Sequence, residues 1–464
     1  MKQVDVVVIG GGVLGCFAAR NLRRWNISVL MLEEKEDVCT GITRANSAIV
    51  YSGYDNRPGT MKAKMTVQGN KDMDRLCRQL DVDYHRCGSL LVCYDQQSAR
   101  RLERKYQHGL QSGVPGLRLL PGAQAEEMEP MLKPGVVSAL YAPTTGTVNP
   151  WQLGIAAYEN ARSNGVQVAL RTKVLAIRKD SDTYTVETTG PLVRCKMILN
   201  CAGLYADRVQ NLLCPGNVRL HWDSADYLVL DPQVDKPARI IFHQAQSCGK
   251  GITAIPCTEG NLLLSGVRRP VTEPFATTYA GLQNLLADAK ALFPDLDLQV
   301  IRSFGAVRPN PITVCGDSLP DFCIENPSPG FYSMIGIKTP GLTCANVLGA
   351  YLAEKAADYL HAGENPQFDP CRQRIVRSST LPEEELHRLI QQDPNYGQIL
   401  CQCGHITTAE VLQAIARGAV SADGVKRRIG TAMGPCQGGR CQWRIEEVLK
   451  QSGVDPILNE VSYD

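Results

Sequence analysis

The stretch from Val4 to Gly15 constrains the fold more than any other part of the chain. A run of branched apolar residues over 4–9 predicts a strand buried on both faces. It ends in the spacing G-x-G-x-x-G, set by Gly10, Gly12 and Gly15. In such a turn the first glycine permits a sharp bend, the second lets the backbone approach a pyrophosphate, and the third lets the next helix pack closely. The stretch therefore predicts a dinucleotide-binding turn.

The residues that follow extend this turn to a βαβ unit. A helix is predicted over 16–25 and a second buried strand over 27–32, after which comes Glu33. An acidic residue about 20 positions beyond the glycines binds a ribose hydroxyl and disfavours a ribose 2′-phosphate. FAD and NAD share this fingerprint, so the unit alone leaves the cofactor open.

Length and composition limit the classes of protein that fit. A chain of 464 residues is too long for one core and predicts two or three domains. A net charge of +2 gives no basic excess for nucleic-acid binding. No apolar run approaches the roughly 18 residues of a membrane span, and the first residues enter a strand instead of a signal peptide. We expect a cytoplasmic protein, with any peripheral membrane association made through a partner.

Three later segments indicate which dinucleotide is bound. Thr40–Ser47 has the form T-G-x-x-x-x-N-S, residues 197–203 form an apolar strand that ends in Ala-Gly, and Gly336–Thr343 reads G-I-K-T-P-G-L-T. Together with the first turn, these segments resemble FAD-dependent oxidoreductases of the D-amino-acid-oxidase and glycerol-3-phosphate-dehydrogenase type. The resemblance covers about residues 1–362 and favours FAD over NAD.

The resemblance implies a set of residues beside FAD. The last segment would place the amino end of a helix against the flavin, where its positive end stabilises a reduced flavin. Relatives often carry histidine where this chain has Tyr51, so a covalent flavin–histidine link at that position is not expected. The expected cofactor residues are Gly10, Gly12, Val13, Leu14, Gly15, Glu33, Thr43, Asn46, Ser47, Val174, Ala202, Gly203, Gly336, Ile337, Lys338, Gly341, Leu342 and Thr343.

Four residues are candidates for substrate contact. In the family it resembles, the arginine of a G-x-x-R-P segment lies near the substrate, and Arg308 has that place here. Lys338 and Lys250 are further cations that could fix an anionic substrate and orient its C–H bond. Tyr51 could contact substrate or flavin. For the cations the alternative is an ion pair or a carbonyl contact, and for Tyr51 it is simple packing.

Of the 18 cysteines, four gather near the carboxyl end and the other 14 are scattered singly, as expected for reduced thiols. Cys401 and Cys403 form C-x-C, and Cys436 and Cys441 form C-x4-C after a gap of 32 residues. This pattern resembles the bacterioferritin-associated-ferredoxin-like [2Fe-2S] module. A zinc ion is the alternative, although zinc modules more often pair two C-x2-C motifs. The basic residues Lys426, Arg427, Arg428 and Arg440 are expected to offset the charge of the cluster.

These segments predict an α/β fold with interleaved domains. A Rossmann-like FAD-binding domain is expected over 1–80, 150–215 and 301–362. An antiparallel-sheet substrate domain is expected over 81–149 and 216–300, followed by a linker over 363–395 and a small, mainly helical [2Fe-2S] domain over 396–464. Helical periodicity is clear at 61–80 and 279–292. The reactive end of the cofactor would lie between the first two domains, where a pocket is expected.

FAD accepts two electrons and a [2Fe-2S] cluster carries one, so the pair predicts a dehydrogenase that exports electrons. No second G-x-G-x-x-G is present to bind NAD, which implies an acceptor on a partner, a second flavoprotein or a quinone-linked subunit. The architecture is similar to that of anaerobic glycerol-3-phosphate dehydrogenases, so an anionic hydroxy compound, glycerol 3-phosphate or a 2-hydroxy acid, is the expected substrate.

One departure keeps the substrate open. The T-G-G-K run of those dehydrogenases is replaced here by Gly336–Gly341, closer to 2-hydroxyglutarate, amino-acid and opine dehydrogenases. The alternatives are therefore a dehydrogenase of a secondary amine or amino acid, such as proline, hydroxyproline, sarcosine or an opine, and a non-catalytic electron-transfer subunit. A flavoprotein that modifies nucleic acid fits the near-neutral charge poorly.

Overall fold

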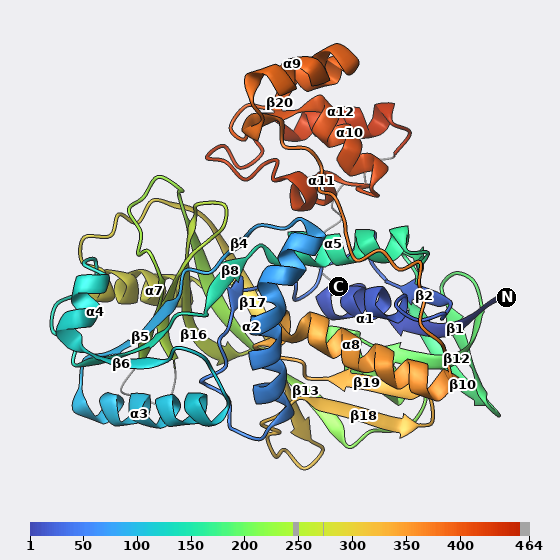
Figure 1. Cartoon of the computed structure of the whole chain (residues 1–464), viewed down its shortest axis with the longest axis horizontal. Coiled ribbons are helices and arrows are strands. Elements are labelled where there is room, and N and C mark those ends of the chain that lie inside the picture. Colours follow the sequence, from blue (N-terminus) through green and yellow to red (C-terminus); the bar gives the residue numbers. More distant parts are fainter. Residues whose placement is uncertain (245–249, 272, 455–464) are drawn as a thin grey trace.

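The computed structural model describes residues 1–244, 250–271 and 273–454, and only the backbone of Lys250. Two large sheets lie side by side, and a small domain formed by the carboxyl-terminal part of the chain sits on one side of them (Figure 1). Helices pack on both sheets. The α/β fold class predicted from the sequence is confirmed.

The first sheet is built around β1 (Lys2–Ile9), which lies between β2 (Val29–Leu32) and β12 (Val193–Asn200), all three parallel. The register brings the carboxyl ends of the three strands level, so the turn at Gly10 opens where they meet. The other strands of this sheet are β9 (Gln167–Ala169), β10 (Val174–Asp180), β11 (Thr183–Thr188), β18 (Cys323–Ser328) and β19 (Phe331–Ile335).

Helices cover this sheet and explain why its central strands are apolar on both faces. Helix α1 (Val13–Leu22) packs against α5 (Pro150–Ser163) and α8 (Gly341–Leu360), and α8 packs in turn against α2 (Met61–Leu80). The α2–α8 contact is close because α2 carries Gly69, where a Cβ would lie 2.1 Å from the carbonyl oxygen of Thr343. Short η1 (Gly203–Tyr205) and α6 (Ala206–Asn211) follow β12.

The second sheet is antiparallel except where β14 and β5 run parallel. Its strand order is β17-β13-β16-β15-β14-β5-β7-β6. The bounds are β5 (Ser89–Cys93), β6 (Arg118–Pro121), β7 (Ser138–Ala142), β13 (Val218–Leu230), β14 (Ile240–Gln244), β15 (Lys250–Pro256), β16 (Leu262–Pro270) and β17 (Val300–Thr313). The helices α3 (Gln96–Gln111), α4 (Gly122–Met128) and α7 (Tyr279–Leu292) pack on it.

One strand of this sheet lies across a predicted domain boundary. The sequence places residues from 301 onward in the FAD-binding domain, whereas β17 pairs along its whole length with β13 in the second sheet. Arg308 therefore comes from the antiparallel sheet. A small three-stranded sheet, β3 (Ile49–Val50), β8 (Gly146–Val148) and β4 (Tyr84–His85), lies next to the residues that connect the two large sheets.

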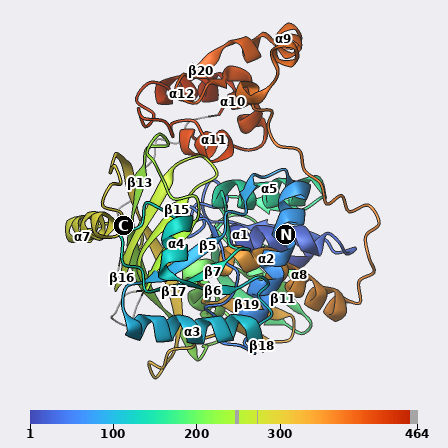
Figure 2. The same cartoon turned by 60° about the vertical axis from the view of Figure 1, so that its left-hand side comes forward.

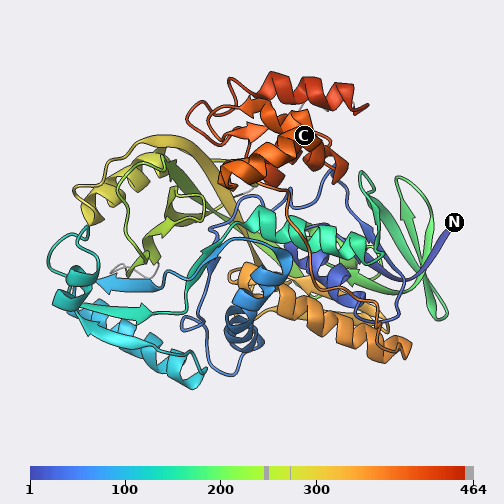
Figure 3. The ribbon, with the colours of Figure 1, turned by 45° about the horizontal axis from the view of Figure 1, so that its top comes forward.

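The C-terminal domain has a small core of its own, formed by side chains such as Val411, Val425 and Ile445. Its elements are β20 (Ile399–Cys401), β21 (Ile406–Thr407), α10 (Thr408–Ala416), α11 (Ala422–Ile429) and α12 (Gln442–Gln451). The predicted linker is not wholly irregular, because it contains η2 (Ser378–Thr380), α9 (Glu383–Gln392) and η3 (Pro394–Gly397). Figure 2 shows the linker passing along the outside of the molecule, and Figure 3 shows the domain above α5.

Candidate functional site

The turn after β1 has the geometry of a phosphate-binding loop. Gly10 has a φ of +104°, and a Cβ there would lie 2.6 Å from the carbonyl oxygen of Cys201. A Cβ on Gly15 would lie 1.9 Å from the carbonyl oxygen of Gly10. Around Gly12, by contrast, the nearest atom to a Cβ would be Thr43 Oγ1 at 3.6 Å. Gly10 and Gly15 are thus required for close packing. At Gly12 the backbone stays accessible, as the approach of a pyrophosphate requires.

Glu33 lies beside this turn at the end of β2. Its Oε2 accepts a hydrogen bond from the Gly11 N–H at 2.6 Å, and its Oε1 accepts one from the Lys35 N–H at 2.9 Å. Burial raises the pKa of the Glu33 carboxyl. The Thr172 N–H donates to the Glu33 carbonyl, which brings Val174, at the start of β10, into the same neighbourhood. The structure therefore gathers the expected ribose-binding acid and Val174 at one end of the turn.

The segment that follows Glu33 returns to the amino end of α1. The Val13 N–H, in the first turn of α1 that also contains Leu14, donates to Thr43 Oγ1 at 3.0 Å. The Ala48 N–H donates to Asn46 Oδ1 at 2.8 Å. Ser47 then lies on the wall of a cavity described below. Thr43, Asn46 and Ser47 thus follow one path from the phosphate loop toward the second sheet.

Two more expected cofactor segments meet this path. Ala202 and Gly203 follow β12 next to Gly10, and Gly203 has a φ of +59°. At the other side, the Tyr51 N–H donates to Thr343 Oγ1 at 3.0 Å, which ties the path to the first turn of α8. Helix α8 begins at Gly341 without a side-chain cap, so the amides of its first turn, which includes Leu342, point to the place expected for the flavin. Gly336 and Ile337 form the turn that leads into it.

A cavity of about 300 Å³ lies between this path and the antiparallel sheet. Its wall on one side comes from residues 47–62 and from Thr339 and Pro340, and on the other side from β13, β14, β15, β16 and β17. The polar and charged side chains among the described lining residues are Ser47, Tyr51, Tyr54, Asp55, Asn56, Lys62, Tyr227, Thr253, Ser265, Arg268, Arg308 and Thr339. The pocket expected between the two domains is therefore present.

Three of the described lining residues are cations. Arg308 comes from β17, Arg268 from β16 and Lys62 from α2. Burial, and then the charge of the neighbouring Arg268, lower the pKa of Arg308 to about 10. The buried Nε of Arg308 has no hydrogen-bond partner among the described residues. A buried donor of this kind is costly unless a ligand accepts from it, so the cavity is suited to an anion.

Tyr51 lies on the cavity wall with its ring stacked on Phe242, the centroids 6.1 Å apart. Burial raises the pKa of Tyr51 above its usual value. Its hydroxyl is therefore protonated at neutral pH and can donate a hydrogen bond to a substrate oxygen. The ring packs on Phe242 and the residue lines the cavity, so contact of Tyr51 with substrate or flavin stays a prediction.

Lys338, another predicted substrate cation, is not among the described residues that line the cavity. Lys338 is buried and its Nζ donates to the carbonyl oxygen of Leu319 at 3.1 Å. Burial, and then the charges of Arg308 and Arg268, lower the pKa of Lys338 to about 8. It lies behind the cavity wall next to Pro340. The side chain of Lys250 lies outside the described residues, so its predicted role is not tested.

The four terminal cysteines converge at one end of the C-terminal domain. The Cys403 and Cys436 sulfurs lie 3.5 Å apart, and the Cys441 thiol is within hydrogen-bonding reach of Cys401. The N–H groups of Arg440 and Gly438 point at Cys436 and lower its pKa. No three His, Cys, Asp or Glu side chains within residues 1–244, 250–271 and 273–454 surround a single point closely enough for one metal ion. Thiols that meet in two pairs fit two iron ions with two thiolates each better than one tetrahedral zinc ion.

The basic residues of α11 have a different role from the one predicted. Arg427 and Arg428 form buried ion pairs with Asp37 of the nucleotide-binding domain instead of facing the cluster. Lys426 is also buried, near Arg302 and Arg44. These cations are close to the cysteines in the sequence, but α11 orients their side chains toward the neighbouring domain. Of these four basic residues, Arg440 acts on the cluster site, because its backbone N–H and then its charge lower the pKa of Cys436.

The chain belongs to the FAD dependent oxidoreductase family, whose model matches residues 5–355. A model of the BFD-like [2Fe-2S] binding domain matches residues 399–451. The predicted cofactors, FAD and a [2Fe-2S] cluster, are thereby confirmed, and the chain is an FAD-dependent dehydrogenase of hydroxy compounds.

Among its relatives, a glycerol 3-phosphate dehydrogenase of Caloramator mitchellensis is 36% identical over 99% of this chain and 96% of that protein. The mitochondrial L-2-hydroxyglutarate dehydrogenase of Homo sapiens is 33% identical over 50% of this chain and 53% of that protein. The solved structure of L-alpha-glycerophosphate oxidase from Mycoplasma pneumoniae, with FAD bound, superposes with a TM-score of 0.74. It covers 80% of this chain and 99% of that one at 24% identity, and shows the shared fold.

Sequence reasoning missed two of the cavity cations. Arg268 lies near the end of β16 and Lys62 in the first turn of α2, and neither belongs to a motif. The signal that could have found Arg268 is the register of β16 against β13, which sets the face of each residue. That register is not available from spacing along the chain.

Proposed function

We propose that the chain oxidises the C2 alcohol of glycerol 3-phosphate to a ketone. The observation that carries this proposal is the set of cations on the cavity, Arg308, Arg268 and Lys62. A phosphate dianion can accept from all three, and the planar guanidinium groups match its oxygens in pairs. Asp55, the one carboxylate among the described lining residues, pairs with Lys105 at 2.6 Å, so the described wall of the anion site is cationic.

The residues divide the work of binding and orientation. Arg308 and Arg268 would hold the phosphate at the sheet side of the cavity. Tyr51 would donate its hydroxyl proton in a hydrogen bond to a substrate oxygen, which fixes the direction of the C2–H bond. When bound, FAD supplies the acceptor for the hydride of that bond. The neighbouring α8 terminus would stabilise negative charge that develops at the cofactor.

A second candidate substrate is L-2-hydroxyglutarate. The support for it is the 33% identity to L-2-hydroxyglutarate dehydrogenase over half of this chain. Its two carboxylates would use the same cations. Because the identity to a glycerol 3-phosphate dehydrogenase extends over nearly the whole chain, we favour the phosphate ester.

Electrons would leave through the [2Fe-2S] cluster to a partner that carries the final acceptor. Cys403 is an exposed residue, which supports access to the cluster from the surface. The proposed partner is a second flavoprotein or a quinone-linked subunit. In the part of the chain that the structure describes, no helix combines the length and the apolar character needed to cross a bilayer.

Anaerobic bleaching of the flavin tests the substrate directly. Oxidised holoprotein is mixed with glycerol 3-phosphate, L-2-hydroxyglutarate, L-lactate, L-proline, hydroxyproline, sarcosine or an opine, and the flavin absorbance is followed without an acceptor. We expect glycerol 3-phosphate to bleach the flavin fastest and the Arg308→Gln variant to need a higher concentration of it. Bleaching by an amine and not by any hydroxy acid or phosphate ester would refute the proposal.

A further inference from the structure

Asp37 is a buried carboxylate that joins the cofactor loop to the C-terminal domain. Its side chain is fully buried, and its Oδ1 accepts a hydrogen bond from the Val38 N–H at 2.8 Å. Arg428 donates to both carboxylate oxygens, at 2.7 Å and 2.9 Å, and Arg427 donates to Oδ2 at 3.0 Å. The two guanidinium side chains are 1% and 5% exposed. One carboxylate thus pairs with two cations from a separate domain at a buried site.

The segment that carries Asp37 is the one that shapes the FAD site. On one side, the Glu33 carboxylate accepts from the Gly11 N–H at 2.6 Å. On the other, the Cys39 N–H donates to the Gly11 carbonyl oxygen at 2.9 Å, two residues after Asp37. The loop that turns around the phosphate site is therefore held at both ends by the dinucleotide turn and in its middle by α11. A displacement of α11 would therefore displace the loop, and a displacement of the loop would displace α11.

The approach of α11 is also sterically defined. A Cβ on Gly424, in the first turn of α11, would lie 3.2 Å from Asp37 Oδ2. Arg428 donates a further hydrogen bond to the Gly424 carbonyl oxygen at 3.0 Å, which holds its side chain along the helix. The ion pairs of Asp37 with Arg427 and Arg428 therefore have one defined geometry, unlike ion pairs between flexible side chains on a surface.

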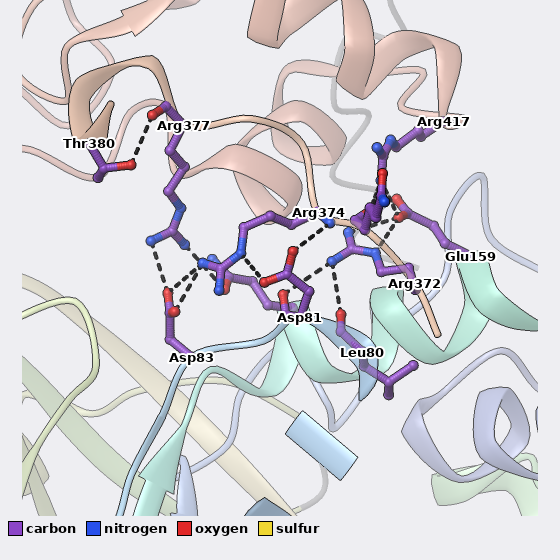
Figure 4. Close-up of polar contacts among 11 residues, drawn as sticks. Leu80, Asp81, Asp83, Glu159, Arg372, Arg374, Arg377, Thr380 and Arg417 are labelled. Carbon is purple, nitrogen blue, oxygen red and sulfur yellow. Dashed lines mark hydrogen bonds and ion pairs between the residues drawn. The ribbon is translucent and has the colours of Figure 1, made fainter. Parts of the chain in front are cut away.

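Other ion pairs also join this part of the chain to the rest of the molecule. Arg372 of the linker and Arg417 of the C-terminal domain pair with Glu159 of α5 at 2.7 Å and 3.0 Å, and a more exposed set lies along the linker. Arg374 contacts Asp81 at 2.7 Å and Asp83 at 2.9 Å (Figure 4), but its side chain is 29% exposed and the two carboxylates are each 40% exposed. Exposed pairs contribute little because water and salt screen them. The Arg374 pairs lie along the linker. They attach the linker to the rest of the chain but do not set the orientation of α11 relative to the FAD loop.

We propose that Asp37 is a positioning residue for electron transfer, because its ion pairs with Arg427 and Arg428 fix the cluster-bearing domain against the FAD loop. The rate of electron transfer falls steeply with the distance between the two centres, so a looser domain slows it. In the step concerned, the reduced flavin gives up one electron and one ferric ion of the cluster becomes ferrous. Ferricyanide, reduced to ferrocyanide, then reoxidises the cluster and allows the second electron to follow. The inference rests on the electron path proposed above and not on the identity of the substrate.

The test uses light and EDTA, which reduce the bound flavin without any substrate. Reduction of the cluster is then followed by its low-temperature EPR signal in rapidly frozen samples. In Asp37→Asn we expect the cluster to be reduced at least about tenfold more slowly, because small displacements have large effects on rate. X-ray scattering of the same samples should show a larger radius of gyration, and FAD should bind the flavin-free variant more weakly.

Matched variants separate positioning from general damage. Arg428→Lys, which keeps the charge and loses the paired contact, should give an intermediate rate, and Arg374→Gln should transfer electrons as the unmodified protein does. If Asp37→Asn does not fold, Arg427→Gln removes one contact of the same carboxylate and should still slow transfer. Wild-type rates and wild-type scattering in these variants would overturn the inference. Failure of glycerol 3-phosphate to bleach the flavin would refute only the proposed substrate.

Discussion

The sulfur atoms of Cys403 and Cys436 lie 3.5 Å apart although 33 positions separate them in the chain. One belongs to the C-x-C motif and the other to the C-x4-C motif, so each motif contributes a thiol to this pair. The pairing follows from the packing of β20 and α12 on the shared core of the C-terminal domain.

We expect Cys403→Ser to lose the cluster and keep the flavin, because serine removes one sulfur ligand from the surface of the domain. Iron analysis and the EPR spectrum of the reduced protein measure the loss. Cys315→Ser is the control, since Cys315 is also exposed but lies in the turn after β17. An iron content in Cys403→Ser equal to that of the control would contradict the assignment.

Gly12 and Gly15 should respond differently to alanine. Gly12→Ala places a methyl group 3.6 Å from Thr43 Oγ1, an ordinary contact, so the flavin-free protein should unfold at an unchanged urea concentration while FAD binds at least about tenfold more weakly. Gly15→Ala places it 1.9 Å from the Gly10 carbonyl oxygen and should destabilise the protein by about 1 to 3 kcal/mol. Urea unfolding and flavin fluorescence titration check both. If the two substitutions lowered the free energy of unfolding equally, the difference in space around Gly12 and Gly15 would be contradicted.

Arg308→Gln and Arg268→Gln should each raise the KM for the substrate. The loss of one charge-assisted hydrogen bond is worth roughly 1.5 to 3 kcal/mol, or about 10- to 150-fold in affinity. Arg178→Gln, an exposed residue paired with Glu187 on the first sheet, is the control and should leave KM unchanged. Steady-state kinetics with glycerol 3-phosphate and ferricyanide measure the effect. An unchanged KM in both cavity variants would move the substrate site elsewhere.

The flavin should be released intact by acid. Tyr51 stands where relatives often carry histidine and its phenol remains protonated, so no covalent link to FAD is expected there. After precipitation with trichloroacetic acid, the yellow colour should be in the supernatant and the pellet should be white. Flavin that remains in the pellet would contradict this expectation.

Lys426 should make the stability of the protein depend on pH. Burial, and then Arg302, Arg427 and Arg44, lower its pKa to about 8, while Asp423 acts in the opposite direction. Because the folded pKa lies below the unfolded value, the penalty for a buried charge is fully present below pH 8. It is relieved as the pH rises toward about 10.5. Unfolding free energy should therefore rise by up to about 1 kcal/mol per pH unit in this window.

Urea unfolding of the unmodified protein and of Lys426→Met at pH 7 and pH 9.5 measures this effect. The variant should be more stable at pH 7, and its advantage should shrink at pH 9.5. Lys173→Met, at an exposed lysine in the turn before β10, serves as the control. A stability difference that does not change with pH would show that Lys426 is not the group that titrates.

Local patterns determined most of the elements. Helices α2 and α7 begin and end where their periodicity predicts, at 61–80 and 279–292, because caps and apolar spacing act within a few turns. Helix α9 was not predicted within the linker, although Leu386, Leu389 and Ile390 have helical spacing; none of its residues is buried. The predicted domain boundary at residue 301 separated β17 from the sheet to which it belongs. Spacing along the chain did not show this, because strand pairing joins residues far apart in the sequence.

The sequence by itself determined the two cofactor sites, since the glycine turn, Glu33 and the four cysteines depend on spacings of a few residues. Only the tertiary structure decided that Arg268 and Lys62 join Arg308 on one cavity, and that Arg427 and Arg428 face Asp37 instead of the cluster. The physical reason is that a turn or a metal motif is set by short-range geometry. The partner of a charged side chain, however, depends on how whole domains pack. Spacing along the chain does not reveal that packing.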